Sequence, residues 1–307
     1  MIADRPIKHS ALARLRDYWT LTKPSLSILV VFSSVVSFML TRGYESFADP
    51  LYRILTLFVS GFLVTGSANA MNQCAEKDTD AGMKRTASRP IASGRMSVQA
   101  GWIFAIVTGV LGVGWLGWAF NTLTAVLAAI SLFLYAFVYT PMKKVSSMAV
   151  LMGAIPGALP CLIGWTAGEG ELSLGGWIVF AFQFFWQFPH FWAIAWVAHR
   201  DYSAVGFKLL PADQGPTRFT ALQTVLYSLL LVPVTLLPYF SGICEYGSVS
   251  GQIGLGLVIL SNVFMIARCV QLYNGMDVKQ ARRVMFGSYL YLPVVMLSWL
   301  LSKITVG

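Results

Sequence analysis

The stretch NQCAEKDTDAGMKRTASRP at residues 72–90 is the most polar part of an otherwise apolar chain. It holds three acidic and four basic side chains: Glu76, Asp78 and Asp80, and Lys77, Lys84, Arg85 and Arg89. Only 11% of the 307 residues are charged. So dense a cluster between long apolar runs indicates a functional site more than a solvated loop.

Within this stretch, one amide and two carboxylates share a helical spacing. Asn72, Glu76 and Asp80 stand at positions i, i+4 and i+8, so on a helix they lie along one face. Oxygen ligands of this kind suit Mg²⁺, which often binds together with phosphate. Three bases that follow offer donors to an anion: Lys84, Arg85 and Arg89. The stretch therefore predicts a Mg²⁺–diphosphate site at the end of a membrane helix.

The composition is that of a polytopic membrane protein. Hydrophobic residues make up 56% of the chain and the mean hydropathy is +0.66, far above the values of soluble domains. The net charge of +9 does not indicate nucleic-acid binding, because the bases lie between apolar runs, where topology signals occur.

The apolar runs predict an all-α bundle of nine transmembrane helices. Each run is long enough to cross a hydrocarbon core of roughly 30 Å. The expected spans are residues 24–41, 51–73, 98–118, 121–140, 147–166, 173–197, 219–239, 249–272 and 284–302. The fifth is interrupted by proline and glycine, which membrane helices tolerate where they pack on neighbours or line a cavity.

The distribution of bases predicts the orientation. With nine spans and a cytoplasmic N-terminus, all but three of the 22 Lys and Arg residues fall on the cytoplasmic side; the exceptions are Arg42, Arg53 and Lys303. The C-terminus is then periplasmic. Neither a cleavable signal peptide nor an Arg/Ser-rich presequence is visible, which favours a bacterial inner membrane.

Two polar stripes are expected inside the membrane. Thr65 and Asn69 continue the column of Asn72 and Glu76 down the second span. The sixth span carries Gln183, Gln187 and His190 at helical spacing. Such residues either connect helices by hydrogen bonds or line a chamber. A chamber is favoured, since both stripes lead to polar loops on one side. In the second loop, Asp201 is the well-placed acid, and if the sixth helix reached it, His190 would lie on nearly the same face, roughly 16 Å deeper.

The motifs resemble those of the UbiA superfamily of intramembrane prenyltransferases. The superfamily pattern NxxxDxxxD followed by RTxxRP is represented by Asn72, Glu76, Asp80 and residues 85–90. PHFW at 189–192 and DYxxxGxxxLP at 201–211 are similar to the haem-farnesylating branch, and the similarity extends over about residues 20–300. Two positions differ from the general pattern. Glu76 replaces an aspartate, and Val205 stands where quinone-type members carry a second acid, which leaves the number of Mg²⁺ ions open and Lys208 as a substitute anion contact.

The resemblance implies transfer of a farnesyl group from farnesyl diphosphate to a vinyl group of haem b, giving haem O. It implies Mg²⁺ as cofactor, with Asn72, Glu76, Asp80 and Asp201 as metal-binding and catalytic residues. Further implied partners are the lipid bilayer and either haem A synthase or terminal oxidase subunits. Lys143 is explained by topology or by contact with a phosphate or propionate.

For the haem, His190 is the candidate iron ligand, because imidazole is a common ligand of iron. The alternative is a buried histidine hydrogen-bonded to Gln187. Gln187 and His199 are additional candidates for haem contact, with His199 less well placed.

The expected organisation is a cytoplasmic segment at 1–23 and one transmembrane domain at 24–303, with loops 73–97 and 198–218 forming the polar rim of a central cavity. Two other functions stay open. A quinone-type prenyltransferase of the same superfamily lacks the PHFW motif. A cation-coupled transporter would place its acids near the middle of the bilayer rather than at one rim.

Overall fold

The computed structural model of the protein describes residues 10–211 and 215–304, so residues 1–9 of the predicted N-terminal segment lie outside the described part. Within these ranges the structure has helices and no named strand. The elements are α1 (Ala11–Leu21), α2 (Pro24–Leu40), η1 (Gly43–Ser46), α3 (Pro50–Ala75), α4 (Lys77–Ala81), α5 (Val98–Ala119), α6 (Thr122–Phe133), η2 (Leu134–Tyr139), α7 (Thr140–Met142), α8 (Ala149–Glu169), α9 (Leu174–Val197), α10 (His199–Ala204), α11 (Arg218–Phe240), α12 (Val249–Gly275) and α13 (Val278–Leu301).

Each predicted span coincides with a helix. Eight helices qualify as spans by length and composition, one of them the combined stretch Thr122–Met142 that unites α6, η2 and α7. The ninth candidate is the pair of α1 and α2 taken together, whose two helices meet at a bend of 48°. The all-α membrane bundle predicted from the apolar runs is therefore confirmed.

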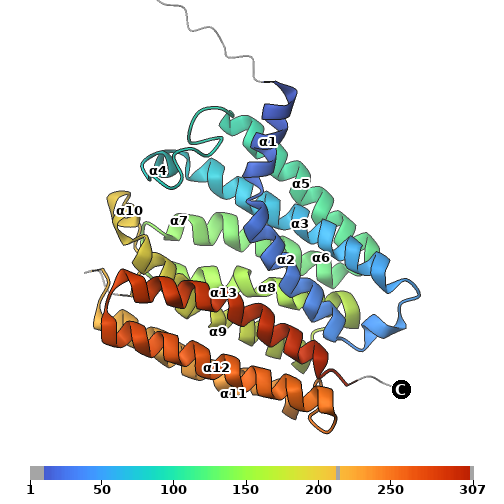
Figure 1. The fold of residues 1–307 in the computed structure, drawn as a ribbon. Helices are drawn as coiled ribbons and strands as arrows, with labels where there is room; N and C mark the ends of the chain where they lie inside the picture. The colour runs from blue at the N-terminus through green and yellow to red at the C-terminus, as the bar shows by residue number, and fades with distance from the viewer. Residues whose placement is uncertain (1–9, 212–214, 305–307) are drawn as a thin grey trace, which may run out of the picture.

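Helix α8 lies at the centre of the bundle (Figure 1). It is the most buried candidate span, with 78% of its apolar window inside the protein, and it packs on α2, α6 and α9. Gly164 permits the contact with α2, because a Cβ atom there would lie 1.9 Å from the carbonyl oxygen of Ser34. Small residues allow membrane helices to approach closely in this way.

The prolines of α8 do not break the helix, which is continuous from Ala149 to Glu169. Pro160 has no N–H to donate to the carbonyl of Pro156. The hydroxyl of Ser131 donates to that carbonyl instead, at 3.1 Å. The prediction that a Pro/Gly-rich span is tolerated where neighbours satisfy its backbone is confirmed here.

The short helices α4, α7 and α10 gather at one end of the bundle (Figure 1). The opposite end is closed by Lys303, whose ammonium lies 2.7 Å from Glu45 and 2.8 Å from the carbonyl oxygen of Thr41. The two polar loops therefore occupy the same end.

Helix α9 does not extend to Asp201. It ends at Val197, and Asp201 lies on the separate helix α10. The carbonyl groups that end α9 are bonded by the N–H of Ala198, which has φ −96° and ψ 12°. The N–H of Tyr202 nevertheless donates to the carbonyl of Ala198 at 3.0 Å, so the chain continues nearly helically into α10, as it does from α3 into α4. The shared face of His190 and Asp201 stays a prediction.

Candidate active site

Asn72, Glu76 and Asp80 are all buried, the first two at the C-terminal end of α3 and the third in α4. Their exposed fractions are 2%, 6% and 1%. Helix α3 ends at Ala75, but the N–H of Asp80 donates to the carbonyl of Glu76 at 2.7 Å, so the chain continues nearly helically into α4. The predicted column is preserved across this junction.

Both buried carboxylates of the column are paired with bases. Arg89 Nη1 lies 2.8 Å from Asp80 Oδ1 and 2.7 Å from Oδ2. Lys143 Nζ lies 2.9 Å from Glu76 Oε1, and Lys143 is itself buried. Since an unpaired buried charge is costly, these pairs account for the tolerated burial of the carboxylates. Lys143, for which topology and anion contact were both considered, therefore contacts the column of Asn72, Glu76 and Asp80.

A third base, Lys23, completes the cluster. Its ammonium donates to Asn72 Oδ1 at 3.0 Å. Lys23 lies just outside α2 with φ 47°, a left-handed conformation that turns the chain before Pro24. Burial, together with the nearby bases Arg89 and Lys143, lowers the pKa of Lys23 to about 7, while two nearby carboxylates act in the opposite direction.

Sequence reasoning treated Lys23 only as a topology charge. Its role depends on the bend between α1 and α2, and its sequence position before an apolar run gives no other signal. We define Asn72, Glu76, Asp80, Lys23, Lys143 and Arg89 as the polar cluster.

The second predicted loop lies against the first. Arg85 Nη2 donates to the hydroxyl of Tyr202 at 2.8 Å, and its guanidinium lies 5.2 Å from that ring centre. The N–H of Lys208 donates to the carbonyl of Lys143 at 2.8 Å. Three loops therefore meet around the polar cluster.

The other predicted site residues of these loops lie nearer the surface. Asp201 is half-buried, whereas Lys84 and Lys208 are exposed. Within the described ranges, none of these three side chains makes a hydrogen bond or ion pair, so the structure does not connect Asp201 directly to the carboxylates of α3 and α4. His199 bonds to Ser203 on α10 and does not line the central cavity.

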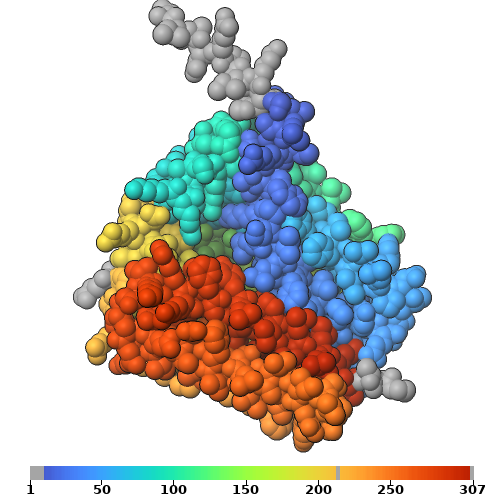
Figure 2. Space-filling view, in the orientation of Figure 1, coloured from blue at the N-terminus to red at the C-terminus, as the bar shows by residue number. Residues whose placement is uncertain are grey.

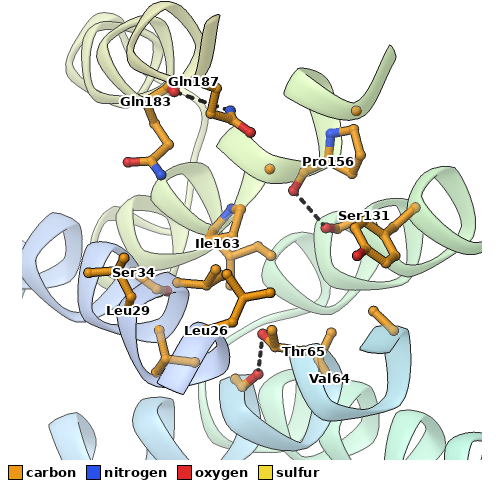
Figure 3. Close-up of a pocket in the computed structure, with 18 of the residues that line it drawn as sticks. Leu26, Leu29, Ser34, Val64, Thr65, Ser131, Pro156, Ile163, Gln183 and Gln187 are labelled. Carbon is orange, nitrogen blue, oxygen red and sulfur yellow. Dashed lines mark hydrogen bonds between the residues drawn. The ribbon is translucent and has the colours of Figure 1, made fainter. Parts of the chain in front are cut away.

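A central cavity begins beside the polar cluster and extends between the helices. Its wall includes Tyr139, over whose ring the ammonium of Lys143 lies at 4.7 Å. Figure 3 shows apolar side chains such as Leu26, Val64 and Ile163 around the space, together with Thr65. Most of the lining is apolar, which suits a hydrocarbon ligand.

The two predicted stripes both line this cavity and connect helices. Gln187 donates to the carbonyl oxygens of Ala154 and Gln183 at 2.9 and 3.1 Å (the second bond is drawn in Figure 3). Asn69 donates to the carbonyl of Thr22 and the hydroxyl of Ser27, each at 3.1 Å. The two interpretations of the stripes are therefore compatible.

His190 lies on the wall of the same cavity with 5% of its surface exposed. Its Nδ1 is 2.7 Å from the hydroxyl of Ser288, so its hydrogen-bond partner is not Gln187. The ring stacks on Trp186 at 4.6 Å and meets the edge of Tyr289 at 4.7 Å.

A lateral groove lies between α2 and α13, whose blue and red surfaces adjoin in Figure 2. Leu26, Leu29 and Tyr289 line both this groove and the central cavity. The cavity is thus separated from the outer apolar surface of the bundle by a single layer of side chains.

The donor set of the polar cluster suits magnesium. Among the described residues, no three His, Cys, Asp or Glu side chains form a ready-made metal cluster. Glu76 and Asp80 are nevertheless buried carboxylates one helical turn apart, and Asn72 lies one turn before Glu76. Mg²⁺ commonly takes one or two carboxylates together with substrate phosphates, and these three groups fit that requirement.

A profile of the UbiA prenyltransferase family matches residues 29–292. The chain belongs to the UbiA prenyltransferase family. It is accordingly a prenyltransferase, as the motifs at residues 72–90 and 189–211 predicted.

Curated relatives of this UbiA protein match it over nearly its whole length. A protein of Cytophaga hutchinsonii named protoheme IX farnesyltransferase is 41% identical over 293 residues, which cover 95% of this chain and 99% of the relative. A protein of Flavobacterium psychrophilum with the same name is 40% identical and is covered over 94% of its length.

Solved UbiA structures have the same fold. A UbiA homolog from Archaeoglobus fulgidus bound to GPP and Mg²⁺ superposes with a TM-score of 0.70 at 16% identity, covering 92% of this chain and 99% of the other. A digeranylgeranylglyceryl phosphate synthase gives a TM-score of 0.75 at 17% identity, with coverages of 94% and 98%.

Proposed function

We propose that the protein transfers a farnesyl group from farnesyl diphosphate to a vinyl group of haem b and releases haem O and diphosphate. The observation that carries the proposal is that the buried polar cluster lies beside an apolar cavity: the ammonium of Lys143 is 4.7 Å from the ring centre of Tyr139, which lines the cavity together with His190. The names of the curated relatives support the same substrates.

The polar cluster would bind the diphosphate. Asn72, Glu76 and Asp80 would hold Mg²⁺, which supplies positive charge to the leaving group when it is bound. In the structure, Lys143 and Arg89 neutralise the two carboxylates. On binding of a metal–diphosphate, the carboxylates would turn to the metal and these bases would donate to phosphate oxygens.

The loops around the cluster would complete this site. Lys23 and Arg85 would donate to the outer phosphate oxygens, and the exposed Lys84 and Lys208 would contact the diphosphate from the solvent side. Asp201, half-buried on α10, would contact a second cation. The solved relative from Archaeoglobus fulgidus, which binds GPP and Mg²⁺, supports a diphosphate site of this type in the fold.

The cavity would hold the two lipophilic groups. Apolar walls that restrict water suit an allylic cation, and nearby aromatic faces stabilise positive charge. The aromatic residues at this wall include Tyr139, Trp186 and Tyr289. His190 would ligate the haem iron and place one vinyl group beside the farnesyl chain. Gln187 would contact the porphyrin edge, and His199, on α10, would contact haem only from the rim.

The reaction balances with one water molecule. The C–O bond of farnesyl diphosphate breaks and its electron pair leaves with diphosphate. The vinyl π electrons form the new C–C bond to the farnesyl carbon, and water adds its oxygen to the other vinyl carbon and loses a proton. Arg89 and the two lysines of the cluster would favour the first step by stabilising the charge that develops on the leaving group.

We place the protein in a bacterial inner membrane with the polar cluster facing the cytoplasm and the C-terminus in the periplasm. In this arrangement residues 1–23 form a cytoplasmic segment, residues 24–303 form one domain, and loops 73–97 and 198–218 form its rim. Haem A synthase or terminal oxidase subunits would receive the haem O.

The test is an assay of the purified protein with Mg²⁺ and farnesyl diphosphate, offering haem b in one reaction and 4-hydroxybenzoate in another. Mass analysis should show a prenylated haem and no prenylated benzoate. Prenylation of the benzoate alone would instead assign the quinone-type activity. Movement of a substrate across proteoliposomes without chemical change would favour a transporter.

A further inference from the structure

Ser288 on α13 is fully buried and makes hydrogen bonds through both its side chain and its backbone. Its hydroxyl lies 2.7 Å from the carbonyl oxygen of Met285 and 2.7 Å from His190 Nδ1. Its carbonyl oxygen accepts from Trp186 Nε1 at 2.9 Å. Trp186 in turn stacks on His190, with an angle of 15° between the rings. One residue of α13 thus holds two neighbouring rings of α9.

The position of the serine hydrogen determines the tautomer of His190. A hydroxyl has one hydrogen to donate. The carbonyl of Met285 can only accept, and two oxygens 2.7 Å apart repel each other unless a hydrogen lies between them, so the Ser288 hydrogen is directed to Met285. The Ser288 oxygen must therefore accept from His190, and Nδ1 carries the proton.

The other ring nitrogen is then left with its lone pair. The surroundings of His190 are apolar and aromatic, and within the described ranges no acidic side chain contacts the ring, which disfavours the charged imidazolium. In the same part of the chain, no group bonds to Nε2, while the ring lines the central cavity. A lone pair on Nε2 is the group that an iron ligand requires.

We propose that Ser288 is a positioning residue that holds His190 as the Nδ1–H tautomer and keeps Nε2 available to haem iron in the cavity. The iron-binding part rests on the proposed function. The hydrogen bond that the non-ligating nitrogen, Nδ1, donates to an acceptor also raises the basicity of a ligating imidazole. Loss of such an acceptor typically weakens metal binding about 10–100-fold.

The first test is the tautomer itself, measured on the full-length protein in nanodiscs by ¹⁵N NMR with labelled histidine. The chain has three histidines, and the His190→Gln variant assigns the resonance. The native protein should show a protonated Nδ1 and an unprotonated Nε2 at His190. In Ser288→Ala, the Nε2–H tautomer should appear. An unchanged tautomer in Ser288→Ala would overturn the proposal.

The second test is the absorption spectrum during titration with haem b. Ser288→Ala should weaken haem binding about tenfold and alter the Soret band, and Ser288→Thr, which retains the hydroxyl, should restore both. If Ser288→Ala does not fold, Ser288→Cys has a similar volume but a weak acceptor and should show the same loss. Native haem affinity and a native spectrum in Ser288→Ala, or in Ser288→Cys if it is the variant used, would overturn the proposal.

The matched control is Ser298→Ala. Ser298 is also a buried serine of α13, but its hydroxyl donates only to the carbonyl of Val294, at 2.6 Å. Its variant should leave the tautomer and the spectrum unchanged. If the native protein binds haem without making haem O, the proposed function fails while the role of Ser288 stands. If haem O forms but Ser288→Ala behaves as native, only the role of Ser288 fails.

Discussion

The ammonium of Lys143 lies 2.9 Å from a carboxylate oxygen of Glu76, and both side chains are about nine-tenths buried. The pair joins the end of α3 to the segment that follows α7. In the structure these two charges neutralise each other. When a metal–diphosphate binds, the carboxylate would turn to the metal and the ammonium to a phosphate oxygen.

We expect a strong coupling between these two residues in stability. Lys143→Met leaves a buried carboxylate unpaired and should lower the free energy of unfolding by about 3 kcal/mol. Glu76→Gln/Lys143→Met should recover most of that loss without recovering activity. Unfolding in detergent, followed by intrinsic fluorescence, measures the cycle. Additive losses would show that the pair does not act as a unit, and the exposed Lys144→Met should have no effect.

Asp80→Asn and Arg89→Ala should each lower kcat/KM for farnesyl transfer about 100-fold or more. Both side chains are assigned to the diphosphate, where charge develops as the bond breaks. The matched control is Asp17→Asn, which weakens an ion pair with Arg95 of 3.1 Å outside the polar cluster. Wild-type rates in both cluster variants, measured by product mass, would remove the assignment of the site.

Lys23→Met should raise KM for farnesyl diphosphate about tenfold, since a hydrogen bond to a charged group contributes about 1.5–3 kcal/mol. The ammonium that now donates to Asn72 is well placed to donate to a phosphate. Initial rates over a range of farnesyl diphosphate concentrations give this value, with Lys144→Met as the charge-matched comparison. A KM unaffected by loss of Lys23 would limit its role to packing.

Tyr202→Phe should loosen α10, because it removes the acceptor of the bond from Arg85. We expect faster hydrogen exchange of amides in α10 and a severalfold lower kcat, because the bond from Arg85 tethers α10 beside the polar cluster. Tyr239→Phe removes a tyrosine–Ser302 hydrogen bond elsewhere in the bundle and should change neither value. Equal exchange in native and Tyr202→Phe proteins would rule out this tether.

The bundle and the polar cluster were predictable to different degrees. The apolar runs mark all nine helices, because a membrane span has a required length. The spacing of Asn72, Glu76 and Asp80 marks the cluster because these residues lie on successive turns of nearly continuous helix. Lys23 and Ser288 were missed, since their roles depend on partners 49 and 98 residues away.

The one-residue interruption between α9 and α10 was also not predicted. It places Asp201 on a separate short helix, and its cause is a local backbone conformation at Ala198 that no glycine or proline signals. The partner of His190 could not be inferred either, because Gln187 is one turn away along the same helix, whereas the actual partner belongs to α13. The spacing of polar residues along one helix was predictable, whereas the partners that these residues find on other helices were not.

The most direct test of the account is mass analysis of haem b after incubation with the protein, farnesyl diphosphate and Mg²⁺. The account predicts a haem that has gained one farnesyl group and one hydroxyl, that requires Mg²⁺, and that is lost with Asp80→Asn. A haem of unchanged mass, in the presence of native protein that prenylates a different acceptor, would contradict it.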